Sequence, residues 1–261
     1  MSKVLVLVPC FNSVKFLQSN LDSILAQTFK DYCVLYIDGG STDNTPTIIK
    51  SFERENIKAV CSPIDTLRAG RTLNWGLTQI PADWDWEYEF RLDADDMMKP
   101  DCLSRLFQEM PGFDCVYSDF EWWDMKDDET ILQKHTVKHE DYRLGRIFDG
   151  HGQGPSRMNT RKIRVAGNGW MEYGHEDWTQ LIIWELLGAK MKHIGDDLFI
   201  YRYKPSGIYQ KMQKDGSNQA MNEKVWDESK ILKSALEHGT LDKVNQNILD
   251  WWRMPCSKFL V

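Results

Sequence analysis

Short apolar runs alternate with segments of helical spacing over the first hundred residues. The apolar runs cover residues 4–8, 33–37, 57–61 and 86–92, and each predicts a buried strand. Between them, apolar positions recur with helical spacing at residues 13–27, 43–52 and 72–79, and Ser41 or Thr42 would cap the second of these helices. This order predicts an α/β fold with a mostly parallel sheet and helices on both faces.

The second half of the chain has a less regular pattern. It predicts strands of a mixed, partly antiparallel extension at residues 116–123 and 130–137, a helix at 176–187 and a short strand at 199–203. Residues 151–159 are polar and aperiodic, which predicts a loop of the kind that covers binding sites. Residues 218–252 predict a charged helical tail. We therefore expect one domain over residues 1–215 and a helical extension over residues 216–261.

Composition narrows the class of protein. The net charge of −7 argues against nucleic acid as the main partner. The six cysteines are scattered without metal-ligand spacing, so we expect buried thiols in a reducing compartment. The apolar run at the N-terminus is too short for a signal peptide, and no stretch is long enough to cross a bilayer. These features predict a cytoplasmic protein without a transmembrane segment.

Trp251 and Trp252 leave two interpretations of the tail open. Tryptophan favours the headgroup region of a bilayer, so the pair could make a peripheral membrane contact beside a lipid acceptor. The same side chains could instead form the apolar face of a helix that packs on the core or on another subunit. No basic cluster accompanies them, which favours packing. The oligomeric state stays open.

Polar clusters follow three of the predicted strands, at residues 9–12, 38–41 and 93–96. Ligands bind at the carboxyl ends of the strands in such sheets, so these clusters predict a site at one edge. Asp93, Asp95 and Asp96 repel one another unless a cation offsets their charge. Mg²⁺ or Mn²⁺ would do so and share its remaining positions with substrate phosphates. The alternative is an acidic turn before a helix that begins near Pro100.

Four motifs carry a family resemblance. In chain order they are Val8-Pro9-Cys10-Phe11-Asn12, Gln27-Thr28-Phe29, Ile37-Asp38-Gly39-Gly40-Ser41-Thr42-Asp43-Asn44-Thr45 and Leu92-Asp93-Ala94-Asp95-Asp96. Together they resemble the family 2 glycosyltransferases of the GT-A fold. Further along, residues 167–170 and 174–178 resemble the acceptor-side Glu-Asp motif of such enzymes.

The resemblance implies an enzyme that transfers a hexosyl or N-acetylhexosaminyl group. The donor would be a UDP-sugar bound by residues 1–97, and the acceptor a carbohydrate or glycolipid hydroxyl bound by residues 98–215. Transfer would proceed by direct displacement with inversion, assisted by Mn²⁺ or Mg²⁺. The ion would neutralise charge on the leaving diphosphate.

The resemblance also assigns donor-side roles. Asp38 would accept a hydrogen bond from the N3–H group of uracil, although a turn aspartate before two glycines is the alternative. Asp95 would be the main metal ligand, with Asp93 and Asp96 dividing further metal and ribose contacts. The implied donor-binding residues are Pro9, Phe11, Asn12, Asp38, Arg68 and Asp93. Phe11 as an ordinary core residue and Arg68 as a solvated arginine at a helix start are the alternatives.

On the acceptor side, the resemblance makes Asp177 the general base and Glu176 the residue that positions the acceptor. Trp170 and Trp178 would stack on sugar rings. The alternative for the carboxylate pair is structural, because acidic side chains are favoured at a helix N-terminus.

One segment departs from the pattern. Many GT-A enzymes supply a histidine to the metal after the Glu-Asp helix, whereas residues 201–204 here read Tyr-Arg-Tyr-Lys. Lys204 could therefore contact the diphosphate directly, which leaves the third metal ligand and the metal dependence open. His151 and His175 are candidate replacements, and solvated loop histidines are the alternative.

Three other functions are alternatives to this prediction. A retaining GT-A transferase shares the motifs around residues 174–178, and the anomer of the product would distinguish it. A nucleotidyltransferase normally needs a glycine-rich basic loop after the first strand, and residues 9–13 contain neither glycine nor lysine. A silent carbohydrate-binding module has no use for the acidic cluster together with Glu176 and Asp177. The sequence leaves the sugar, the acceptor and the linkage undefined.

Overall fold

The computed structural model describes residues 3–63, 69–139, 155–172, 176–205, 207, 219–245, 247–248 and 252. Strands in this part of the chain form one mixed sheet in the order β3-β2-β1-β4-β8-β6-β9-β5, with β7 beside β6. Their bounds are β1 (Val4–Cys10), β2 (Tyr32–Asp38), β3 (Ile57–Cys61), β4 (Tyr88–Arg91), β5 (Met97–Met98), β6 (Cys115–Met125), β7 (Ile131–Val137), β8 (Arg157–Thr160) and β9 (Met191–Tyr203). The helices are α1 (Leu17–Leu25), α2 (Thr45–Ser51), α3 (Ala69–Leu77), α4 (Cys102–Glu109), α5 (Arg161–Ala166), α6 (Glu176–Leu186), α8 (Gln219–Glu237) and the 3₁₀ helix η2 (Leu241–Lys243).

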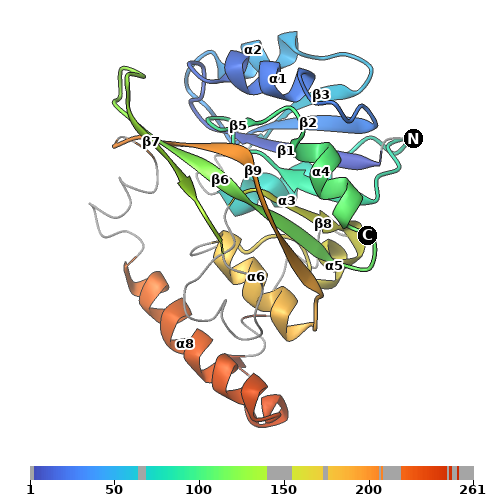
Figure 1. Cartoon of the computed structure of the whole chain (residues 1–261), viewed down its shortest axis with the longest axis vertical. Helices are drawn as coiled ribbons and strands as arrows, with labels where there is room; N and C mark the ends of the chain where they lie inside the picture. The colour runs from blue at the N-terminus through green and yellow to red at the C-terminus, as the bar shows by residue number, and fades with distance from the viewer. Residues whose placement is uncertain are drawn as a thin grey trace.

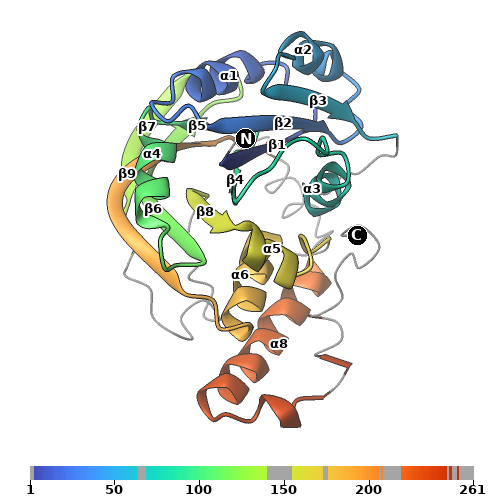
Figure 2. The ribbon, with the colours of Figure 1, turned by 90° about the vertical axis from the view of Figure 1, so that its right-hand side faces the viewer.

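The first four strands form a parallel layer between helices. Strand β1 pairs in parallel with β2 and β4, and β2 pairs in parallel with β3. Alternate side chains of β1 enter different cores: Val4, Val6 and Val8 pack with α1 and α2, while Leu5 and Leu7 pack with α3. Figure 2 shows α1 and α2 on one face of this layer and α3 on the other. This half confirms the predicted fold class.

The sheet then curls through longer strands of mixed direction (Figure 1). Strands β6 and β9 pair in parallel, with irregular register at residues 118–120, and β7 lies antiparallel to β6. Strand β9 begins at Met191, well before the predicted strand at 199–203. The polar residues Lys192, His193 and Asp196 interrupt the apolar pattern at its start, which explains the short prediction.

Strand β8 corrects the prediction of a loop over residues 151–159. Arg157–Thr160 is antiparallel to both β4 and β6, so it joins the two halves of the sheet. Three of its four residues are polar, and only Met158 contributes an apolar side chain to the core. Residues 151–154 of the predicted loop lie outside the described residues.

The start of α2 also differs from the prediction. The helix begins at Thr45, and the residue at its N-cap is Asn44, whose side chain makes no capping hydrogen bond. Ser41 and Thr42 instead bond to Asn12, through the Ser41 hydroxyl and the Thr42 amide. The two hydroxyl residues therefore join two loops rather than cap the helix.

The described part of the tail packs on the core. Val225 and Leu232 of α8 share an apolar cluster with Leu181 and Ile182 of α6. Trp252 is buried in the same cluster, and its Nε1–H donates to Glu228 at 2.9 Å. The packing interpretation is confirmed for Trp252, while Trp251 lies outside the described residues. The predicted domain boundary at residue 215 stays a prediction for the same reason.

Two other predictions concern composition. The structure buries Cys10, Cys33, Cys102 and Cys115, and none of the cysteines it describes forms a disulfide. Across its described segments, the model contains no helix that is long and apolar enough to span a bilayer.

A fully buried ion pair fixes α5 against β4. The Glu89 carboxylate is 0% exposed and the Arg164 guanidinium 1% exposed, with Arg164 Nη2 at 2.7 Å from Glu89 Oε1. Arg164 also donates to the Gly169 carbonyl and lies 3.8 Å from the centre of the Trp170 ring. Removing one partner would leave an uncompensated charge in a dry environment.

We predict that Glu89→Leu lowers the free energy of unfolding by about 3–5 kcal/mol, because Arg164 would remain charged and unpaired. Glu87 pairs with Lys3 at an exposed position, so Glu87→Gln should cost less than about 1 kcal/mol. Chemical denaturation of both variants measures the difference. Equal costs for the two variants would contradict the account.

Candidate active site

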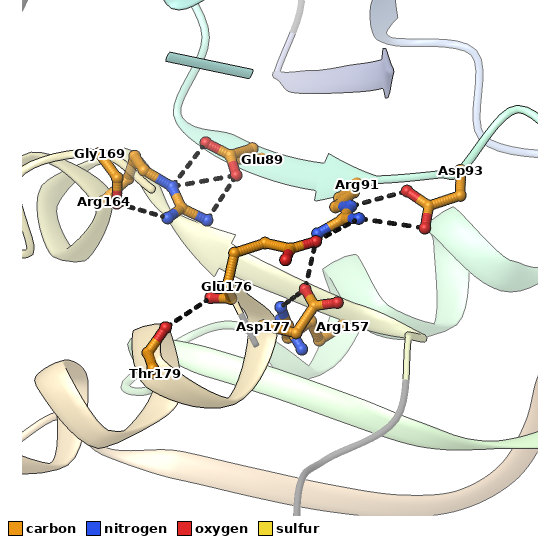
Figure 3. Close-up of polar contacts among 9 residues, drawn as sticks. All are labelled: Glu89, Arg91, Asp93, Arg157, Arg164, Gly169, Glu176, Asp177 and Thr179. Carbon is orange, nitrogen blue, oxygen red and sulfur yellow. Dashed lines mark hydrogen bonds and ion pairs between the residues drawn. The ribbon is translucent and has the colours of Figure 1, made fainter. Parts of the chain in front are cut away.

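Arg91 lies at the centre of the candidate site. Glu89 and Arg91 are two residues apart on β4, so both side chains face away from the core that holds Phe90. Arg91 Nε and Nη2 donate to the two carboxylate oxygens of Asp93 at 2.7 and 3.1 Å. Its Nη1 donates to Asp177 at 2.8 Å and its Nη2 to Glu176 at 3.1 Å. Figure 3 shows this guanidinium between the Asp93 loop and the start of α6.

Arg91 and its neighbour Arg157 were not predicted from the sequence as residues of the site. Arg157 Nη2 donates to Asp177 Oδ1 at 2.5 Å, from a strand that was predicted to be a loop. One feature of the sequence could have identified Arg91. It is a charged residue at the end of an apolar strand, two positions before Asp93. Its partners Glu176 and Asp177 are 85 and 86 residues away, and sequence spacing carries no information about such a contact.

The arginines affect the pKa values of the neighbouring carboxylates to different extents. Burial raises the pKa of Glu176 and of Asp93, and Arg91 only partly opposes this. Burial also disfavours ionised Asp177, but Arg91 and Arg157 outweigh it and hold the pKa of Asp177 below its ordinary value. Asp177 therefore stays ionised at neutral pH, as a group that accepts a proton must be.

The start of α6 presents its two carboxylates differently. The Asp177 side chain is 47% exposed and that of Glu176 23% exposed. The helix N-terminus favours both negative charges, and Leu181, Ile182 and Trp184 anchor the helix in the core. Asp177 is the more accessible of the pair to an incoming molecule.

A small cavity lies beside this cluster at the carboxyl ends of β1 and β4. Its volume is about 140 Å³, and it is lined by Pro9, Cys10, Phe11, Ser13, Ala69, Thr72, Arg91, Asp93, Ala94 and Asp95. The structure thus brings Pro9, Phe11, Asp93 and Asp95 together, as expected for the rim of the sheet.

Asn12 and Asp38 bond to the loops that flank this cavity. Asn12 has a left-handed backbone, with φ of 49°, and its Oδ1 accepts from the Thr42 amide at 2.8 Å. Asp38 is buried, and its Oδ2 accepts from the amides of Gly40 and Ser41, both at 3.1 Å. These bonds are those of a turn aspartate. Arg68, the other donor-side prediction, lies outside the described residues.

Asp95 and Asp96 contact Arg202 of β9 and Lys204, the residue that follows this strand. Lys204 Nζ lies 2.9 Å from Asp95 Oδ2. The Arg202 amide donates to Asp96 Oδ1 at 2.9 Å, and the Arg202 side chain donates to the Asp95 carbonyl. Burial and the nearby Asp95 and Asp93 raise the pKa of Asp96 well above its ordinary value. Asp96 Oδ2 is buried without a hydrogen-bond partner among the described residues.

These contacts test the predicted metal site. Both oxygens of Asp93 are bonded to Arg91 and one oxygen of Asp95 to Lys204. Among the residues that the structure describes, no group of three or more His, Cys, Asp or Glu side chains could hold a metal ion. In this arrangement the described carboxylates are paired with protein cations and do not by themselves form a site for Mn²⁺ or Mg²⁺. His151 and His175, the candidate replacements, lie outside the described residues.

The predicted acceptor platform at Trp170 is wrong. Its side chain is 2% exposed, and Arg164 and Arg91 lie 3.8 and 5.1 Å from its ring centre. The ring therefore packs against guanidinium groups inside the protein and cannot stack on a sugar. Trp178 is half-buried and packs on Trp226 of α8, with ring centres 5.5 Å apart.

Comparison with known proteins identifies the family. The sequence profile described as "Glycosyl transferase family 2" matches residues 5–168 of this 261-residue chain. The chain belongs to this family. The match includes both strands that supply the cavity and both arginines that contact Asp177.

Relatives of this glycosyltransferase family member share modest identity. Glycosyltransferase GlyA of Streptococcus pneumoniae is 22% identical over 147 residues, which cover 56% of this chain and 20% of GlyA. The succinoglycan biosynthesis protein ExoW of Rhizobium meliloti is 34% identical over 119 residues, covering 44% of this chain and 36% of ExoW. The chain thus spans only a minor part of the length of these relatives.

Solved structures confirm the GT-A fold. S. aureus TarS (residues 1–349) in complex with UDP-GlcNAc superposes with a TM-score of 0.62 at 17% identity, covering 96% of this chain and 78% of TarS. The mannosyltransferase PcManGT of Pyrobaculum calidifontis, in complex with GDP-Man and Mn²⁺, has a TM-score of 0.61 at 15% identity. The latter match covers 97% of this chain and 83% of PcManGT.

We predict that Arg91→Lys lowers the free energy of unfolding by about 2–3 kcal/mol. Lysine keeps the charge but cannot bridge three carboxylates with one planar group, so charge-assisted hydrogen bonds are lost. Arg105 forms an exposed pair with Asp196, and Arg105→Lys should change stability by less than about 1 kcal/mol. A stable Arg91→Lys variant in chemical denaturation would contradict the bridging role.

Proposed function

We propose that this chain transfers a sugar from a UDP-sugar to a hydroxyl group of a carbohydrate or glycolipid acceptor, with inversion of the anomeric carbon. Family membership supports glycosyl transfer. The observation that carries the proposal is the Arg91 cluster, in which one guanidinium bonds to Asp93 on the cavity wall and to the accessible Asp177. A donor in the cavity and an acceptor at Asp177 would meet at this residue.

The donor nucleotide would bind along the cavity lined by Pro9 and Phe11. The Phe11 ring is the candidate surface for the base. Asp38 Oδ2 is used by the turn, whereas Oδ1 has one weaker contact, to the Ser41 amide at 3.4 Å. We propose that Oδ1 accepts the uracil N3–H. That TarS has been solved with UDP and with UDP-GlcNAc is consistent with this donor class.

Asp177 would take the proton of the acceptor hydroxyl while the bond to the diphosphate breaks. An accessible carboxylate next to the donor cavity suits direct displacement, in which the base and the leaving group lie on opposite sides of the anomeric carbon. Glu176, less exposed and bonded to Arg91, would position the acceptor.

We predict that Asp177→Asn reduces the transfer rate by about 10²–10⁴-fold, the range for loss of a general base. UDP affinity, measured by calorimetry, should stay within about threefold, because the donor cavity is unchanged. Asp196 is a half-exposed carboxylate in an ion pair with Arg105 outside this site, and Asp196→Asn is the matched control.

A normal transfer rate for Asp177→Asn would contradict the assignment of Asp177 as the general base. The product anomer, read by proton NMR, separates the two reaction types. Inversion relative to the UDP-sugar is expected, and retention would favour the retaining alternative.

We predict that Arg157→Gln moves the acidic limb of the pH–rate profile to higher pH. Arg157 helps to hold the pKa of Asp177 below its ordinary value. Its removal raises that pKa, so Asp177 becomes protonated, and inactive as a base, at a higher pH. Arg161 is an exposed arginine on α5 that stacks on Trp86. Arg161→Gln should leave the profile unchanged, and an equal shift in both variants would contradict the account.

A further inference from the structure

Lys204 is the residue that follows β9, and its ammonium group lies beside Asp95. Its side chain is 10% exposed, and its Nζ lies 2.9 Å from Asp95 Oδ2. The same Nζ lies 3.4 Å from the centre of the Phe16 ring, a cation–π distance. A lysine ammonium is costly to bury without a partner, and these two contacts offset its loss of hydration.

Asp95 joins this ammonium to the donor cavity. Its side chain is 41% exposed and lines the cavity, while its Oδ2 is bonded to Lys204. The neighbouring acids have other partners: Asp93 is held by Arg91 and Asp96 by the Arg202 amide. Lys204 is therefore the cation that satisfies the carboxylate expected to bind a metal.

We propose that Lys204 is the built-in counter-ion of the donor diphosphate and occupies the position beside Asp95 that a divalent cation would otherwise take. This inference rests on the proposed function. It assigns a substrate-binding role to the ammonium and makes donor binding independent of a divalent metal.

The proposal rests on the charge of the Lys204 ammonium and on its distance from Asp95 Oδ2. A divalent cation would bind Asp95 Oδ2 at about 2.0–2.6 Å, where it would meet an ammonium that already lies 2.9 Å from the same oxygen. Binding the ion at this oxygen would require Lys204 to move away from it. A phosphate oxygen, in contrast, can share the ammonium with Asp95, because a lysine has three hydrogen-bond donors.

The test is calorimetric titration of UDP into the whole chain in EDTA and, separately, with Mn²⁺. The wild type should bind UDP in EDTA, with at most a threefold gain from Mn²⁺. Lys204→Met keeps an apolar stem over Phe16 and removes the charge, so it should weaken binding about ten- to hundredfold, the loss of one charge-assisted hydrogen bond. Lys204→Arg should restore most of the affinity. Lys192 pairs with Glu109 at a partly exposed position, and Lys192→Met is the matched control.

A second readout follows free Mn²⁺ by electron paramagnetic resonance. The wild type should leave the Mn²⁺ signal undiminished, with or without UDP. Lys204→His replaces the ammonium with a metal ligand beside Asp95, and it should take up Mn²⁺ in the presence of UDP.

The outcomes separate the two claims. UDP binding that requires Mn²⁺, stoichiometric Mn²⁺ uptake by the wild type, or unchanged metal-free UDP affinity in Lys204→Met would each overturn the role of Lys204 alone. No binding of UDP under either condition would overturn the proposed donor as well.

Discussion

The ionic contacts of one buried guanidinium hold the two halves of the site together. Arg91 is 9% exposed, yet it bonds to Asp93 beside the donor cavity and to Glu176 and Asp177 at the start of α6. A charge in this position is tolerable only because several carboxylates offset its desolvation. The same contacts keep those carboxylates close together despite their mutual repulsion. The position of α6, the ionisation of Asp177 and the shape of the cavity wall all depend on this residue.

Two further arginines, Arg157 and Arg164, lie near Arg91, and each forms an ion pair with a carboxylate. Arg164 neutralises Glu89 beneath α5, and Arg157 adds a second positive group beside Asp177. Both contact the Trp170 ring at distances within 6 Å, as Arg91 does. The tryptophan ring thus lies within cation–π distance of three guanidinium groups. Charge and aromatic packing stabilise the sheet where β4 meets the antiparallel half.

The sequence allowed the fold of the first hundred residues to be predicted because strands buried on both faces are continuous apolar runs. The same rule failed for β8, whose residues are mostly polar, and for the start of β9. The carboxylates of the site were found from local motifs. Their cationic partners were missed or incompletely assigned. Arg91 meets Glu176 and Asp177, and Lys204 meets Asp95, across 85 to 109 residues of the chain, and Arg157 lies in a segment without an apolar pattern. Trp170 looked like a sugar platform beside an acidic motif, but its ring is buried in an apolar cluster with Leu73 and Trp86 and also contacts three arginines. The three aspartates suggested a metal site, and the structure adds the contacts of Asp95 with Lys204 and of Asp96 with the Arg202 amide.

The central claim is that one site around Arg91 receives the donor and the acceptor side by side. A crystal structure of the chain with UDP, grown in EDTA, tests it most directly. The account predicts UDP in the cavity beside Phe11, with its diphosphate in hydrogen-bond reach of Lys204 and with Arg91 still bonded to Asp93 and Asp177. UDP bound elsewhere on the molecule, or an Arg91 side chain detached from both carboxylates, would contradict it.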